Sequence, residues 1–311
     1  MVSLNDGRIR GKPFPFPPGI TGRELESVPS AHPFWRLRDG HTTFCAMANY
    51  ETLLYEERNG VAWVTLNRPE VNNAFDPRMQ EELKDVWTSL KKNYDVRCVV
   101  LTGAGEKAFC TGIDRAIMDN WGGTPTNPWS FPVDIGRNIG PKANHLWTPV
   151  IVAVQGMACG GAFYFLGEAE FIIASETATF FDPHVSYGMV AGYESVHLMQ
   201  KAPFHEVMRI ALLGNNERMS AKRAYEIGLV SEVVPADKLT EAVTWAAESI
   251  AALSPAAVQG TVRAMWMGID APRSVAIELA PLVVRLGTTN DNINEGQASF
   301  TKGERPKYRI R

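Results

Sequence analysis

The chain is 311 residues long, has a formal net charge of −3 with a pI near 6.1, and contains four cysteines. The slightly negative net charge does not indicate a nucleic-acid-binding protein, and no apolar run is long enough to cross a bilayer. The N-terminus lacks the apolar core and small-residue cleavage site of a secretory signal, and the cysteines have no paired metal spacing. We therefore expect a cytoplasmic protein with reduced core thiols and no metal site.

Residues 1–49 form an extension that is rich in proline and aromatic residues. The run GKPFPFPPG at 11–19 cannot form a helix or a central strand. Such a segment is either a loose tail or an arm that docks through its aromatic side chains, and both possibilities stay open. Those side chains are Phe14, Phe16, Phe34 and Trp35.

Regular structural signals begin at Tyr50. LLYEERN and GVAWVTLN predict two strands joined by a tight turn at Asn59-Gly60. Asp76-Pro77 supplies an N-cap and a first-turn proline for a helix that extends to about Lys92. The short apolar run RCVVLTG then predicts a strand in a covered sheet.

Two glycine turns follow apolar strands. AFCTGID, at 108–114, comes after the strand at Cys98–Thr102, and VIVAVQGMACGGAFY, at 150–164, runs through Gly160 and Gly161 into a helical pattern. Backbone N–H groups at such turns favour an oxyanion, and two turns converging on one oxygen suggest chemistry through an enolate or alkoxide. The alternative for either turn alone is ordinary strand-to-helix punctuation.

The downstream half is mostly helical. EFIIAS predicts another apolar strand and leads into ATFFDPHVSYG, after which the pattern turns helical from Tyr193. Apolar spacing of three and four residues predicts helices over Met219–Ile227, Leu239–Leu253 and about Pro272–Gly287.

Three of these stretches resemble the enoyl-CoA hydratase/isomerase (crotonase) superfamily: AFCTGID, PVIVAVQGMACGGA and MSAKRAYEIGLVSEVVP. VAWVTLNRPEVNNAFD and EGQASFTKGERPKY are similar to its first and last signatures, so the resemblance covers about residues 50–308. It implies an α/β fold with a core of stacked ββα units at 50–214, followed by a helical trimerisation and coenzyme A region at 215–311. It further implies an acyl-CoA thioester substrate, no tightly bound cofactor, coenzyme A as part of the substrate, and a homotrimer or hexamer.

The resemblance also implies site residues. The amides of Thr111 and Gly161 would form an oxyanion hole. The expected coenzyme A contacts are Asn73, Ala74, Ile113, Phe300 and Arg305. The resemblance implies that the stretch from about Met118 to Pro141 borders the acyl group as a substrate loop or lid; the alternative is a surface loop with its aromatic residues turned inward. The expected pocket residues are Trp121, Trp129, Phe131 and Tyr187.

The chain departs from the family at both hydratase glutamates, whose positions are occupied by Tyr164 and His184. Histidine can activate water at neutral pH, and tyrosine can donate a hydrogen bond or proton. Asp182, two residues before His184 in a segment expected to be extended, would share its face and orient the imidazole. In the alternative interpretation, both replacements are structural residues.

Several other polar residues are weaker candidates. Tyr193 and Glu194 fall where some relatives place displaced acid/base groups, whereas Glu168 and Glu170 are out of register. Asp114 is expected to cap the helix after the first glycine turn. His145 is undecided by its spacing.

Three functions remain open. The first is an enoyl-CoA hydratase/isomerase-type lyase that holds a thioester enolate. The second is hydrolytic carbon–carbon cleavage of a cyclic 3-oxoacyl-CoA or β-diketone, with His184 as the base. The third is an acyl-CoA binding protein without catalysis.

Overall fold

The computed structural model describes residues 50–118, 135–303 and 308–311. The proline-rich extension at 1–49, the aromatic loop residues Trp121, Trp129 and Phe131, and Arg305 lie outside the described residues. The backbone of Phe300 is described, but its side chain is not.

The larger sheet has six strands in the order β1-β2-β3-β5-β7-β10. β1 (Leu53–Arg58) and β2 (Val61–Leu66) form the predicted antiparallel hairpin, and every other neighbouring pair is parallel. The turn is left-handed at both residues, with φ of 52° at Asn59 and 73° at Gly60, as a type I′ turn requires. The remaining strands are β3 (Cys98–Gly103), β5 (Val150–Val154), β7 (Phe171–Ser175) and β10 (Glu232–Val234).

A second, four-stranded sheet has the order β4-β6-β8-β9. β4 (Ala108–Cys110), β6 (Met157–Cys159) and β8 (Thr179–Phe181) are parallel, and β9 (Met219–Ser220) is antiparallel to β8. Each of the pairs β3/β4, β5/β6 and β7/β8 places one strand in each sheet, which makes the stacked ββα architecture. The parallel strands of the smaller sheet end at Cys110, Cys159 and Phe181, so the segments that follow them emerge at one edge.

The larger sheet is buried on both faces, and β3 shows how. Cys98 and Val100 pack with α8 (Leu239–Ala251), while Val99 and Leu101 belong to the main core on the opposite face. This alternation follows the two-residue period of a strand. The main core includes Trp87 of α1 (Pro77–Leu90), a helix that Asp76 caps as predicted by accepting from the Met79 amide at 2.7 Å.

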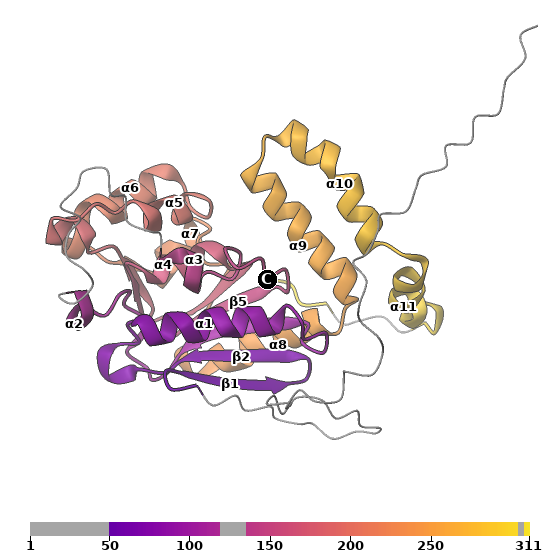
Figure 1. Ribbon diagram of the computed structural model, residues 1–311, viewed down its shortest axis with the longest axis horizontal. Helices are drawn as coiled ribbons and strands as arrows, with labels where there is room; N and C mark the ends of the chain where they lie inside the picture. The colour runs from indigo at the N-terminus through magenta and orange to yellow at the C-terminus, as the bar shows by residue number, and fades with distance from the viewer. Residues whose placement is uncertain (1–49, 119–134, 304–307) are drawn as a thin grey trace, which may run out of the picture. The chain divides into compact units, whose positions relative to one another are not determined.

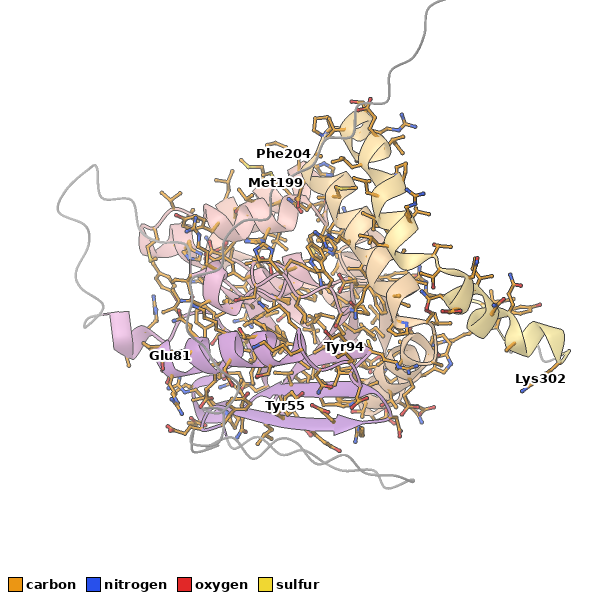
Figure 2. The ribbon with its side chains drawn as sticks, turned by 45° about the vertical axis from the view of Figure 1, so that its right-hand side comes forward. Tyr55, Glu81, Tyr94, Met199, Phe204 and Lys302 are labelled. Carbon is orange, nitrogen blue, oxygen red and sulfur yellow. The ribbon has the colours of Figure 1, made fainter. Side chains whose placement is uncertain are left out.

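The shorter helices connect these layers. They are α2 (Arg115–Met118), α3 (Gly136–Ile139), α4 (Ala162–Glu168), α5 (Tyr193–Met199), α6 (Phe204–Leu213) and α7 (Ala221–Glu226), with 3₁₀ turns at Pro69–Val71, His184–Tyr187, Gly214–Asn216 and Ala236–Lys238. Met199 and Phe204, where α5 passes into α6, are exposed (Figure 2).

The C-terminal region is helical, as expected. α9 (Pro255–Asp270) and α10 (Arg273–Gly287) lie side by side as an antiparallel pair, and α11 (Asn290–Thr301) follows (Figure 1). The predicted block at Pro272–Gly287 corresponds to α10, whereas α9 and α11 had no separate prediction. No helix among the described residues has the length and apolar character that a membrane crossing requires.

Candidate active site

A cavity of about 610 Å³ opens where the three parallel strands of the smaller sheet end. Its walls come from the segments after β4, β6 and β8, together with α5 and the turn before α1. The lining residues that matter below are Ala74, Thr111, Gly112, Ile113, Arg115, Cys159, Gly160, Gly161, Phe181, His184, Tyr187, Glu194 and Arg218.

The two glycine turns predicted from the sequence adjoin one another in this cavity. Gly112 has a φ of +84°, and a Cβ there would lie 2.8 Å from the Gly161 nitrogen. A Cβ on Gly161 would in turn lie 2.6 Å from Cζ of Phe75. Only glycine permits both the backbone conformation and this close approach.

Three backbone amides at these turns make no hydrogen bond within the described part of the chain: those of Thr111, Ile113 and Gly161. The neighbours of Ile113 are both engaged by Phe75, whose amide donates to Gly112 at 2.8 Å and whose carbonyl accepts from Asp114 at 3.0 Å. In such a parallel bridge the N–H of the central residue points to the opposite side. The amide of Ile113 therefore faces away from Phe75.

His184 lies beside the second glycine turn and contacts Asp182. Its Nδ1 is 2.5 Å from Asp182 Oδ1, and its backbone amide donates to the same oxygen at 3.0 Å. The sequence predicts an extended segment here, and this prediction is wrong: Pro183 has φ −82° and ψ −7°, and a 3₁₀ turn begins at His184. The Asp182–His184 contact thus arises from a tight turn, because the helical ψ of Pro183 folds the chain back.

Glu194 lies on the other side of the same imidazole. Its Oε1 is 3.5 Å from His184 Nε2, and its carboxylate is buried in the cavity wall. The hydrogen bond to Asp182 raises the pKa of His184, the negative charges of Glu194 and Asp182 add to this, and burial opposes it. From the sequence Glu194 is only a weaker candidate, because its contact with His184 depends on how α5 packs against α4 and α6.

Tyr164 is not among the residues that line this cavity. It is buried on α4, and its ring packs edge to face against His197 with centroids 5.2 Å apart. Cys159 does line the cavity, but burial raises the pKa of its thiol to about 12, so it is a poor nucleophile at neutral pH.

The expected coenzyme A residues fall into two groups. Ala74 and Ile113 line the cavity, as does the expected pocket residue Tyr187. Asn73 is instead fully buried, and its side-chain amide donates to the carbonyls of Ala104 and Ala108 at 2.9 and 2.8 Å. Asn73 thus holds the turn whose neighbours Asn72 and Ala74 reach the cavity.

The weaker candidates have structural partners. Glu168 accepts from the backbone amides of Lys142 and Ala143, and Glu170 pairs with Lys142 at 2.9 Å. Asp114 accepts from the Ala116 amide at 3.0 Å, which confirms the predicted cap, and also pairs with Arg68 at 2.8 Å. His145 is exposed and is not among the cavity residues.

Two arginines that the sequence reasoning missed also line the cavity. The guanidinium of Arg115 lies 3.6 Å from the ring centroid of Tyr187, and that of Arg218 lies 4.4 Å from the ring of Phe181. The aromatic rings hold the two guanidinium groups in place by cation–π contacts, so two positive charges have fixed positions in the cavity wall. No group of histidine, cysteine and acidic residues suited to a metal ion occurs in the part of the chain that the structure describes.

Comparison with known proteins agrees with this architecture. The model of the enoyl-CoA hydratase/isomerase family matches residues 56–310. An (E)-benzylidenesuccinyl-CoA hydratase from Thauera aromatica is 34% identical over 257 residues, which cover 82% of this chain and 97% of that protein.

Solved structures give the same result. An enoyl-CoA hydratase/isomerase from Mycobacterium paratuberculosis superposes with a TM-score of 0.72 at 36% identity, covering 85% of this chain and all of the other. An enoyl-CoA hydratase from Bacillus anthracis has a TM-score of 0.71 at 28% identity, covering 84% and 97%. The chain therefore belongs to the enoyl-CoA hydratase/isomerase family and is an acyl-CoA-processing enzyme.

Proposed function

We propose that this enzyme adds water across the double bond of an α,β-unsaturated acyl-CoA thioester. The observation that carries the proposal is the meeting, in one cavity, of two glycine turns with unengaged amides and the Asp182–His184 pair. Hydration needs these two elements: hydrogen-bond donors for the enolate oxygen, and a positioned group that transfers protons.

The thioester oxygen would be held by backbone amides. Gly161 supplies one donor, and the turn from Thr111 to Ile113 supplies the other. These amides are fixed by the backbone before the substrate arrives, so they need not reorganise as charge develops on the oxygen. The orientation of the Ile113 amide, away from Phe75, favours it as a donor beside or instead of Thr111.

His184 would exchange protons with the reacting carbons or with water. A Cβ placed on Gly160 would lie 3.6 Å from Cε1 of His184, so the imidazole is next to the turn that would hold the thioester. Asp182 orients the ring through Nδ1, and Nε2 lies 3.5 Å from Glu194, another residue that lines the cavity.

The acyl group is proposed to be bulky. The Thauera aromatica relative is named for benzylidenesuccinyl-CoA, an aryl-bearing thioester, and the cavity here has a volume of about 610 Å³. Arg115 and Arg218 would attract an anionic part of the substrate, on the acyl group or on coenzyme A.

A panel of thioesters tests the proposal: crotonyl-CoA, cinnamoyl-CoA, (E)-benzylidenesuccinyl-CoA and a cyclic 3-oxoacyl-CoA. We expect hydration of an aryl-bearing enoyl-CoA, with a loss of about 10²–10⁴-fold in kcat for His184→Ala. Cleavage of the 3-oxo thioester without any hydration would overturn the hydratase assignment. Tight calorimetric binding with no turnover would instead indicate a binding protein.

A further inference from the structure

Hydration requires two proton transfers, one from water and one to the α-carbon. In this structure the imidazole of His184 has Asp182 beside its Nδ1 and Glu194 beside its Nε2. The family's two glutamate positions are occupied here by Tyr164, which is not a lining residue, and by His184. One of the two transfers is therefore unassigned if His184 acts alone. This inference rests on the proposed hydration.

Glu194 fits the unassigned step by position. Its carboxylate lines the cavity that holds His184 and the Gly160–Gly161 turn, and its Oε1 lies 3.5 Å from His184 Nε2. Among the described lining residues the only other carboxylate is that of Asp114, which pairs with Arg68, whereas the carboxylate of Glu194 contacts the imidazole itself. Glu194 is thus the acidic side chain that shares the substrate's side of the imidazole.

The surroundings of His184 favour a protonated ring. Asp182 lies 2.5 Å from Nδ1, its second oxygen, Oδ2, is buried without a hydrogen-bond partner among the described residues, and Glu194 lies beside Nε2. Two carboxylates around one imidazole stabilise its cationic form, and the raised pKa agrees with this. A protonated imidazole is an acid, so the base must be another group.

We propose that Glu194 is the second proton-transfer residue, taking a proton from the attacking water while His184 donates its Nε2 proton to the α-carbon. The hydroxide oxygen bonds to the β-carbon as the double-bond electrons move to the thioester, forming the enolate. Collapse of the enolate then forms the Cα–H bond with the proton from Nε2.

The site resets itself without an outside proton. After the reaction Glu194 is a neutral acid and His184 a neutral imidazole, and the 3.5 Å contact lets the proton return from Oε1 to Nε2. The net change is the addition of one water, with H on the α-carbon and OH on the β-carbon. Both residues end in their starting states.

Glu194→Gln tests this role, because it keeps the shape of the side chain and removes its basicity. We expect a fall of about 10²–10⁴-fold in kcat with little change in KM, partial activity in Glu194→Asp, and loss of the acidic limb of the pH–rate profile. Glu206→Gln is the matched control: Glu206 is a buried glutamate of α6 that pairs with Arg223 outside the cavity. Full activity and an intact acidic limb in Glu194→Gln would overturn the inference.

A second measurement does not depend on turnover. In protein with ¹³C-labelled histidine, the His184 resonance is identified by its absence in His184→Gln, and its titration is followed by NMR. We expect Glu194→Gln to lower the His184 midpoint, since a negative charge beside Nε2 is removed. An unchanged midpoint overturns the inference even if the wild-type enzyme hydrates none of the thioesters, whereas that inactivity alone refutes only the proposed function.

Discussion

The indole of Trp266, on α9, donates a 2.7 Å hydrogen bond to Glu170 Oε1, immediately before β7. The same carboxylate pairs with Lys142 at 2.9 Å and accepts from the Val150 amide. One partly buried acidic side chain thus links the C-terminal helical pair to the larger sheet. Glu170, a weak catalytic candidate in the sequence, has a structural role that the fold makes evident.

Removing this hydrogen bond should weaken the attachment of α9. Trp266→Phe keeps most of the ring but leaves Glu170 without one charged-group hydrogen bond, which costs about 1.5–3 kcal/mol of unfolding free energy. Urea denaturation followed by circular dichroism measures the change. Trp245→Phe, at a half-exposed tryptophan of α8, is the control, and equal effects of the two substitutions would contradict the assigned role.

Gly112→Ala should impair both folding and turnover. Its φ of +84° strains any side chain by about 1–2 kcal/mol, and the new Cβ would lie 2.8 Å from the Gly161 nitrogen. Gly228→Ala is a matched control, because Gly228 has the same φ of +84° with open space around it.

The two alanine variants should therefore differ. We expect the free energy of unfolding to fall in both variants, by the strain energy of the positive φ. Only Gly112→Ala should also lose hydration activity beyond what its lower stability explains. Comparable kcat values in the two variants would argue against a role for this turn in holding the thioester.

The titration of His184 should appear in the pH dependence of stability. Its pKa is raised in the folded state, so its stabilising contribution is fully present below the unfolded value of about 6.5 and is lost as pH rises through the folded value. The free energy of unfolding of the wild type, relative to His184→Gln, should therefore decline across that window. Urea titrations at a series of pH values measure this difference, and Asp182→Asn should reduce the decline. A difference that grows with pH would contradict the assignment.

The family resemblance implies a homotrimer or hexamer, and the C-terminal helices carry apolar residues that suit such an interface. Leu282 and Leu286 of α10 are 62% and 76% exposed. We predict that light scattering will show a trimer or hexamer at micromolar concentration and that Leu282→Asp with Leu286→Asp will dissociate it. Leu212→Asp, at a similarly exposed leucine of α6, is the control. A monomeric wild type would refute the prediction.

Local sequence signals were enough to predict much of this protein's backbone structure. Asn59-Gly60 can adopt the left-handed conformation of a tight hairpin turn, Asp76 can cap the helix that follows it, and Gly112 permits a positive φ. In each case the physical cause is a side chain, or its absence, acting on backbone within a few residues. The family motifs likewise depend on such turns, so fold and family were predictable.

The composition of the cavity was decided by tertiary structure. Tyr164 and Gly161 are three residues apart, yet the helical path of α4 sends Tyr164 toward His197, while Gly161 lines the cavity. Glu194 reaches His184 only because α5 packs against α4 and α6, which brings its first turn next to the segment that Pro183 begins. Contacts between side chains on separate elements depend on how those elements pack, and spacing along the chain carries no direct record of that packing.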